Sequence, residues 1–222
     1  QDAEFKLSAG DLSLTDTVIG RNASLELDKG NLNMANVKVG AALKAKLLTG
    51  AVGSASDRAS VQSDDLDIMA NGDIYLNTTS LNGDAAKMGK IVSNNGNIDL
   101  TAGNDNIILN NMIAARNGDV QISAKGSIDD EYQDAINGTI QAGSITLSAL
   151  NVDYIYSPQT VHLKASNITD ARADSCIQFG GINAVQQLRA IPTSAVCNIS
   201  LLICRSRILI RPIKAGRHTC IR

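Results

Sequence analysis

The sequence contains two clusters of three carboxylates within a few residues: Asp64, Asp65 and Asp67 in "DDLD", and Asp129, Asp130 and Glu131 in "DDE". Such groups can bind calcium, or serve as the acids and bases of a polysaccharide lyase or hydrolase. Asp65 and Asp67, two residues apart, would share one face of a strand, a spacing that suits a hard cation. A solvated acidic surface is the commoner outcome. We therefore assign no catalytic, cofactor-binding or metal-ligating residue and expect no enzyme.

Other reactive side chains are few and scattered. His162 stands between Val161 and Leu163, so alternation predicts an exposed strand residue rather than a base. A pectin-active groove would also need converging aromatic and basic residues. The residues available for one are Tyr75, Tyr132, Tyr154, Tyr156 and Arg116.

The charge distribution divides the chain in two. All 22 acidic residues lie at or before Asp174, and they outnumber the 13 Lys and Arg of that segment to give a net charge of −9. The last 48 residues carry +7, no acid, and all the cysteines: Cys176, Cys197, Cys204 and Cys220. The negative charge disfavours nucleic-acid binding by the first segment. We expect two units, residues 1–174 and 175–222.

A repeat occupies the first unit. Gly followed by Asp, Asn or Ser and an apolar-x-apolar triplet begins at these glycines: Gly10, Gly30, Gly72, Gly96, Gly118 and Gly143. The steps are 20, 42, 24, 22 and 25 residues, and the longest would contain a looser copy within "GSASDRASVQSDDLDI". Apolar residues often precede the glycine by five and three positions. Each unit therefore reads as strand, tight turn, strand.

Alternation predicts which side chains face inward. These are Leu12/Leu14, Leu32/Met34, Ile74/Leu76, Ile98/Leu100, Val120/Ile122 and Ile145/Leu147. The residues between them face solvent: Ser13, Asn33, Tyr75, Asp99, Gln121 and Thr146. A unit this small buries its apolar face only by stacking on a neighbour.

The repeat predicts an all-β fold, a right-handed parallel β-helix (solenoid) of about seven or eight rungs. The corner glycines of Asn-Gly and Lys-Gly would supply positive φ, and the Asp or Asn that follows would bond back to its own turn. Asn71, Asn95 and Asn117 would stack as an amide ladder. The alternative is a sandwich of hairpins with Asn-Gly turns.

The stretches "NGDIYLNTTSLNG", "NGNIDLTAGNDNIILNNMIAARNGDVQISAKGSI" and "AGSITLSALNV" resemble repeats of filamentous-haemagglutinin-type exoproteins, the large adhesins of two-partner secretion in Gram-negative bacteria. The resemblance covers roughly residues 5–170. It implies a β-helical rod without catalytic residues, secreted through an outer-membrane transporter to the cell surface. The asparagine-proline motifs of that family's secretion domain are absent, so the chain resembles the rod region of the family and not its N-terminal export module.

The basic segment, 175–222, has several interpretations. One interpretation is a poorly folded or out-of-frame end, and another is a cap with a short helix over 184–191. A third is a cationic module like the toxin end of contact-dependent inhibition relatives. The Val-Glu-Asn-Asn connector usual before such toxins is missing. No apolar run is long enough to span a membrane. Because the chain begins at Gln1 without a leader, we expect it to be an interior piece of a longer protein.

We expect a rod segment of a secreted adhesin that contacts host-cell glycans, surface proteins or other bacteria, and that needs no cofactor. The alternatives are a β-helical polysaccharide lyase or hydrolase and a fragment of a contact-dependent inhibition exoprotein.

Overall fold

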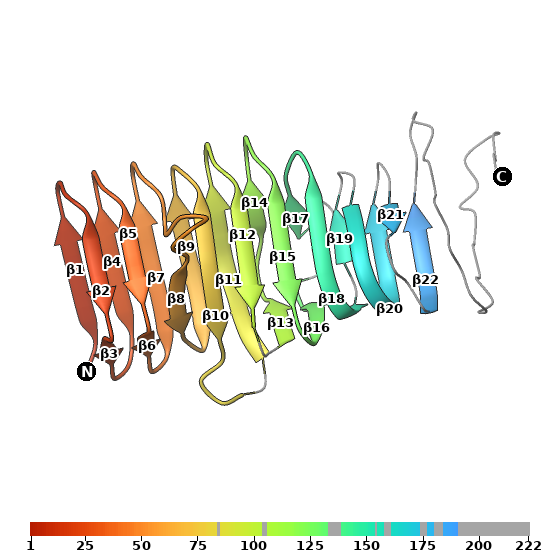
Figure 1. Cartoon of the computed structure of the whole chain (residues 1–222), viewed down its shortest axis with the longest axis horizontal. Coiled ribbons are helices and arrows are strands. Elements are labelled where there is room, and N and C mark those ends of the chain that lie inside the picture. Colours follow the sequence, from red (N-terminus) through yellow and green to blue (C-terminus); the bar gives the residue numbers. More distant parts are fainter. Residues whose placement is uncertain are drawn as a thin grey trace.

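The computed structural model describes residues 1–83, 85–103, 106–132, 139–153, 155–157, 161–173, 177–179 and 184–190, with side chains up to Val152. Every strand pairing is parallel, and none of the described residues is helical. The strands lie across the long axis and follow one another from the N-terminus in sequence order (Figure 1). The described part of the chain is a parallel β-solenoid, as the repeat predicted, and not a sandwich of hairpins.

Three stacks of strands form its walls. The first stack contains β1 (Ala3–Leu7), β4 (Ala23–Leu27), β7 (Ala42–Leu47), β9 (Asp65–Ala70), β11 (Ala85–Ser93), β14 (Ile113–Ala115) and β17 (Ile140–Gln141). The second contains β2 (Leu12–Thr15), β5 (Leu32–Ala35), β10 (Ile74–Thr79), β12 (Ile98–Ala102), β15 (Val120–Ala124), β18 (Ile145–Asp153), β20 (Val161–Ala173) and β21 (Ile177–Phe179). The third begins with β3 (Val18–Ile19), β6 (Val37–Val39) and β8 (Ala59–Gln62).

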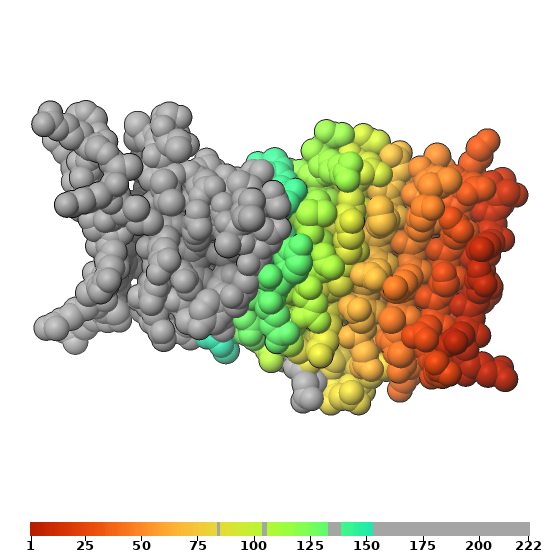
Figure 2. Space-filling model, turned by 180° about the vertical axis from the view of Figure 1, so that it is seen from behind, coloured from red at the N-terminus to blue at the C-terminus, as the bar shows by residue number. Residues whose placement is uncertain are grey.

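From β11 onward the longer rungs add strands beside these stacks. β13 (Asn106–Leu109) and β16 (Ser127–Asp130) continue the first half of β11, and the second half of β18 pairs with β16. β19 (Ile155–Ser157) and β22 (Ala184–Ala190) both pair with β20. The surface of the described part is continuous from rung to rung when seen from the other side (Figure 2).

One ladder of inward aliphatic residues shows the repeat most clearly. About six turns lead along the second stack from Leu12 to Ile145. The backbone pairing then continues to Val161 and Ile177. Within this ladder Val52 pairs with Leu32 on one side and Ile74 on the other. Val52 follows Gly50 by two residues, so the looser copy of the repeat starts at Gly50, earlier than "GSASDRASVQSDDLDI".

The predicted inward residues form the core. Ile74, Leu76, Leu100, Ile122 and Leu147 are all 0% exposed. The remaining predicted positions are also buried, except Leu12 in the first rung, which is partly exposed. Each inward side chain therefore packs against its counterparts in adjacent rungs, which is how the repeat buries what a single unit cannot.

The corner glycines are required for two different reasons, and only one was predicted. Gly10, Gly30 and Gly50 have positive φ, as expected for such a turn. Gly72, Gly96 and Gly118 do not, so the Asn-Gly part of the prediction is wrong. At Gly96 and Gly118 an added Cβ would instead collide with the backbone of the rung below. Close stacking at the corner excludes a side chain there.

Polar residues at the corners bond between rungs. The amide ladder is confirmed, because Asn95 Nδ2 donates to Asn71 Oδ1 at 2.8 Å and Asn117 Nδ2 donates to Asn95 Oδ1 at 3.0 Å. The residue after the glycine does not act as predicted. Asp73 Oδ1 accepts the backbone N–H of Asn97 in the next rung at 2.7 Å, where a bond to its own turn was expected.

The short helix expected over 184–191 is also wrong, since 184–190 form strand β22. Val185 pairs with Ile168 and Leu188 with Ala171, so pairing with a preceding rung overrides the local helix propensity of this segment. β21 and β22 lie beyond residue 174, where we expected the first unit to end. Residues 191–222 and the four cysteines lie outside the described residues.

Candidate functional site

The first acidic cluster lies at the start of β9 on the outer face of the first stack. Asp64 is exposed at the corner, while Asp65 and Asp67 are partly exposed and point to the same side, as their spacing predicted. Asp65 Oδ1 accepts the N–H of Leu66 at 3.0 Å, and Asp67 Oδ1 accepts the N–H of Lys90 at 2.7 Å. Both carboxylates therefore accept hydrogen bonds from backbone N–H groups, Asp65 from its own rung and Asp67 from the next rung.

Gly89 makes the space for these carboxylates. The register of β11 shifts between Met88 and Ile91, and a Cβ on Gly89 would collide with the carboxylate oxygens of Asp65 and Asp67. Burial, followed by the neighbouring charge of Asp67, raises the pKa of Asp65 above its usual value. Among the described residues, no three His, Cys, Asp or Glu side chains gather in a way that would hold a metal ion.

The second acidic cluster is divided between the two sides of β16. Asp129 faces outward and Glu131 is exposed, but Asp130 is fully buried and lies above Leu109 in the ladder of inward residues. The hydroxyl of Thr139, also fully buried, donates to Asp130 Oδ2. The expectation of a solvated acidic surface is therefore wrong for Asp130. Because strand neighbours alternate, at least one of any three consecutive residues on a strand faces inward.

The other predicted residues do not converge. The backbone of His162 pairs with Thr146 in the outward column of the second stack, in agreement with the predicted register. Tyr75 is partly exposed, whereas Tyr132 and Arg116 are exposed on other segments. Tyr154 and the side chain of Tyr156 lie outside the described part of the chain.

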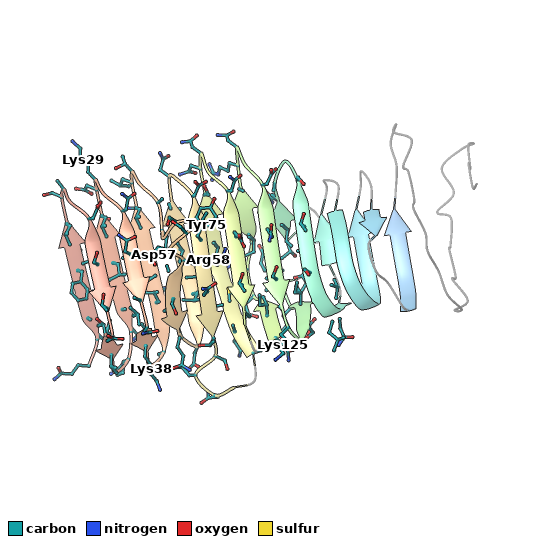
Figure 3. All side chains as sticks on the ribbon, in the orientation of Figure 1. Lys29, Lys38, Asp57, Arg58, Tyr75 and Lys125 are labelled. Atoms are coloured by element: carbon teal, nitrogen blue, oxygen red, sulfur yellow. The ribbon has the colours of Figure 1, made fainter. Side chains whose placement is uncertain are left out.

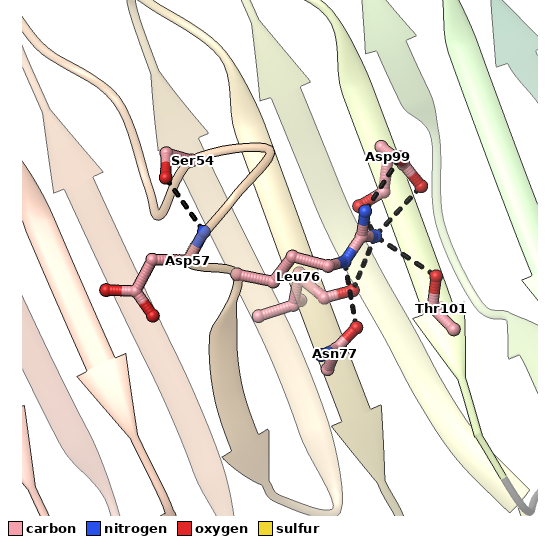
Figure 4. Close-up of polar contacts among 7 residues, drawn as sticks. Ser54, Asp57, Leu76, Asn77, Asp99 and Thr101 are labelled. Atoms are coloured by element: carbon pink, nitrogen blue, oxygen red, sulfur yellow. Dashed lines mark hydrogen bonds and ion pairs between the residues drawn. The ribbon is translucent and has the colours of Figure 1, made fainter.

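Arg58 forms a polar clamp that the sequence did not predict. It ends the loop after Gly53 and lies on the outer face of β10 and β12 (Figures 3 and 4). Its Nη1 and Nη2 donate to the two carboxylate oxygens of Asp99 at 2.7 and 2.8 Å. Nε donates to Asn77 Oδ1 at 2.8 Å, and Nη2 also reaches Thr101 Oγ1 at 3.1 Å.

Three features make this clamp stronger than an ordinary surface ion pair. The side chains of Arg58 and Asp99 are only 20% and 22% exposed, and their contact is bidentate. The guanidinium carbon also lies 5.9 Å from the centre of the Tyr75 ring, within the range of a cation–π contact. With every guanidinium nitrogen bonded to the protein, the clamp ties the irregular loop to two regular rungs.

A second polar surface, the lysine face, covers the outer side of the first stack. It consists of Ser24 and Glu26 on β4, Lys44 and Lys46 on β7, Asp67 and Met69 on β9, and Lys90 on β11. These residues line a shallow hollow of about 300 Å³. Lys46 Nζ lies 3.1 Å from Glu26, and Lys44 Nζ lies 3.8 Å from Asp67, while Met69 is 40% exposed.

Sequence signals for both surfaces were present. Arg58 lies in the stretch that interrupts the repeat, and an insertion of this kind must be fixed to the rungs beside it. Lys44 and Lys46 alternate with Leu43, Ala45 and Leu47, which predicts two lysines on one outer face. The hollow depends on how four rungs align, which a single repeat unit does not reveal.

No protein-family model, curated protein or solved structure matches this chain. Within the described residues, no helix has the length and apolar character needed to cross a membrane.

Proposed function

We propose that this chain is a rod segment of a secreted bacterial surface adhesin, and that the lysine face is its contact surface. The observation that carries the proposal is the hollow on this face, where charged and polar side chains from four successive rungs reach solvent. With rungs about 4.8 Å apart, these side chains extend over roughly 15 Å of the rod. The sequence pattern of the repeats resembles that of filamentous-haemagglutinin-type exoproteins, and this resemblance supports the same proposal.

The inward and outward side chains of each strand differ in chemistry, and this difference favours a contact role for the outer face. Inward positions repeat one aliphatic chemistry and stabilise the rod. Outward positions differ from rung to rung, as in the column Ser24, Lys44 and Asp67. A rod of this kind presents charged side chains at a fixed spacing along its length. Such an array suits recognition of an extended glycan or of a protein surface on host cells or other bacteria.

Retention of the purified chain on host cells, on bacteria and on glycan arrays tests the proposal. The variant Lys44→Gln/Lys46→Gln should lose at least about ten-fold in retention, because it removes two cations from the hollow. Lys29→Gln/Lys38→Gln is the matched control, since both lysines are exposed and neither lines the hollow. Circular dichroism should show the same β signal for both variants.

Two results would contradict the adhesin proposal. One is retention on none of the three surfaces. The other is the release of unsaturated products from polygalacturonate in the presence of calcium, which would favour the lyase alternative. An equal loss in both double variants would leave an adhesin but place its contact surface elsewhere.

A further inference from the structure

Asn-Gly dipeptides occur five times in this chain, at Asn71, Asn82, Asn95, Asn117 and Asn137, and all but the last lie among the described residues. An asparagine followed by glycine is chemically labile. The glycine has no Cβ to hinder its backbone nitrogen from attacking the asparagine side chain. The described pairs differ in how tightly the fold holds them.

Two of the pairs belong to turns with the same local sequence and the same hydrogen bond. Both turns read Ser-x-Asn-Gly, from Ser80 to Gly83 and from Ser93 to Gly96. The N–H of Gly83 donates to Ser80 Oγ at 2.6 Å, and the N–H of Gly96 donates to Ser93 Oγ at 2.8 Å. A difference in reactivity between these two turns must therefore come from the stacking of rungs.

Neighbouring rungs hold the Asn95–Gly96 pair. Asn95 Nδ2, the atom that deamidation would release, donates to Asn71 Oδ1 at 2.8 Å. Asn95 Oδ1 accepts from Asn117 Nδ2 at 3.0 Å. Gly96 is buried, and a Cβ on it would lie 2.4 Å from the backbone nitrogen of Asp73. The glycine nitrogen therefore cannot turn toward the asparagine side chain unless the stack opens.

The other two pairs of the amide ladder are restrained in the same way. A Cβ on Gly118 would lie 2.4 Å from the backbone oxygen of Gly96. A Cβ on Gly72 would lie 2.9 Å from the backbone oxygen of Gly50, and the N–H of Gly72 donates to that oxygen at 2.7 Å. Each of these glycines is packed directly on the corner of an adjacent rung.

Stacking does not restrain the Asn82–Gly83 pair in this way. Both residues are exposed in the bend between β10 and β11. No described atom lies within 4 Å of the place where a Cβ on Gly83 would stand. Only the bond to Ser80 Oγ holds the glycine nitrogen among the printed contacts of the turn, and open space around Gly83 lets the turn rotate.

We propose that Asn82 is a deamidation site of the folded rod, and that stacking protects Asn71, Asn95 and Asn117. The backbone nitrogen of Gly83 gives its proton to water and attacks Asn82 Cγ, which closes a cyclic imide. The bond from Cγ to Nδ2 breaks, and Nδ2 takes up a proton and leaves as ammonia. One water molecule then opens the imide to aspartate or isoaspartate. The reaction consumes water, releases ammonia and adds one negative charge to an exposed bend.

Peptide mapping by mass spectrometry after incubation of the 222-residue chain at mildly alkaline pH tests the proposal. Water enriched in the heavy oxygen isotope marks each asparagine that has reacted. Asn82 should convert at least about ten-fold faster than Asn71, Asn95 or Asn117, because the ladder sites react only after their rungs open. In denaturing urea the stack is lost, and the four sites should convert at similar rates.

Two further measurements complete the test. Asn82→Gln should remove the fast conversion and leave circular dichroism and urea unfolding unchanged, because this side chain is exposed. The converted parent chain, separated by anion exchange, should unfold at the same urea concentration as the unconverted chain, since isoaspartate lengthens the backbone only in an unstacked bend. Equal conversion of Asn82 and Asn95 in the folded chain would overturn the proposal. Faster conversion of any ladder asparagine than of Asn82, or a converted chain that unfolds at lower urea concentration, would overturn it as well.

Discussion

Arg58 and Asp99, 41 residues apart in the sequence, form a bidentate ion pair on the outer face of the second stack. The pair joins the loop that interrupts the repeat to a regular rung two turns beyond Val52. The alternation of β12 predicts that Asp99 faces outward, and it does. Alternation alone also predicts that its substitution has almost no effect, whereas the clamp predicts a loss of stability.

Asp99→Ala should lower the free energy of unfolding by about 1–3 kcal/mol, because Arg58 would keep a largely buried charge without its carboxylate. Gln121→Ala, one rung later in the same outward column, is the matched control and should cost less than about 0.5 kcal/mol. Urea unfolding followed by circular dichroism gives both values. Equal costs would show that the clamp does not stabilise the rod.

Inward positions should respond much more strongly. Leu100→Asp and Ile122→Asp each place a carboxylate where the parent side chain is 0% exposed, so we expect a loss of several kcal/mol and the opening of neighbouring rungs. Hydrogen exchange of backbone amides on β10, β12 and β15 measures how far the opening spreads. Loss of protection on β12 alone after Leu100→Asp would contradict the stacked-core description.

Much of the architecture could be predicted because it depends on two local patterns. The alternation of Leu100 and Asp99 assigns each side chain to a face, and the recurring glycine sets the length of a rung. The reason for each glycine could not be predicted in the same way. Both Gly30 and Gly96 lack room for a Cβ above the rung below, but only Gly30 also adopts positive φ, and only the stacked structure shows this difference.

The candidate surfaces were harder to predict for a related reason. Asp130 looks like part of an acidic run, yet its position above Leu109 makes it a core residue bonded to Thr139. Arg58 reaches residues 18 to 43 positions away. Lys90 joins Lys44 and Lys46 only because the register shift in β11 aligns it with their face. Contacts between rungs determine the positions of Arg58 and Lys90, whereas strand alternation and a contact within one rung place Asp130 in the core.

In the column of residues that follow the corner glycines, Asn97 lies between Asp73 and Asp119. Asp73 Oδ1 accepts the N–H of Asn97, and Asn97 Oδ1 accepts the N–H of Asp119 at 2.9 Å, so the amide separates two carboxylates. Asn97→Asp keeps the acceptor but places three carboxylates about 4.8 Å apart. It should lose about 0.5–1 kcal/mol of stability at low salt.

Salt dependence distinguishes this effect from a lost hydrogen bond. Raising the salt to 1 M shortens the screening length to about 3 Å, so the Asn97→Asp variant should recover most of its stability. Asn97→Ala removes the acceptor and should lose about 1 kcal/mol at either salt concentration. Thermal unfolding of both variants in low and high salt is the measurement. A salt-independent loss for Asn97→Asp would refute the repulsion argument.

Asp65 should make the stability of the rod depend on pH. Burial and the charge of Asp67 raise its pKa in the folded state, so the folded chain binds the proton more tightly than the unfolded chain. The associated stability is present at acid pH, where Asp65 is protonated in both states, and is lost as the pH rises through the raised pKa.

The variant Asp65→Asn stays neutral at every pH. Its amide oxygen can still accept the N–H of Leu66, which donates to Asp65 Oδ1 at 3.0 Å in the parent. The variant should therefore unfold at a higher urea concentration than the parent at pH 7, and the advantage should disappear near pH 3, below the ordinary Asp value of 3.8. A variant less stable than the parent at pH 7, or equally favoured at both pH values, would show that the ionised carboxylate is not held at a cost beside Gly89.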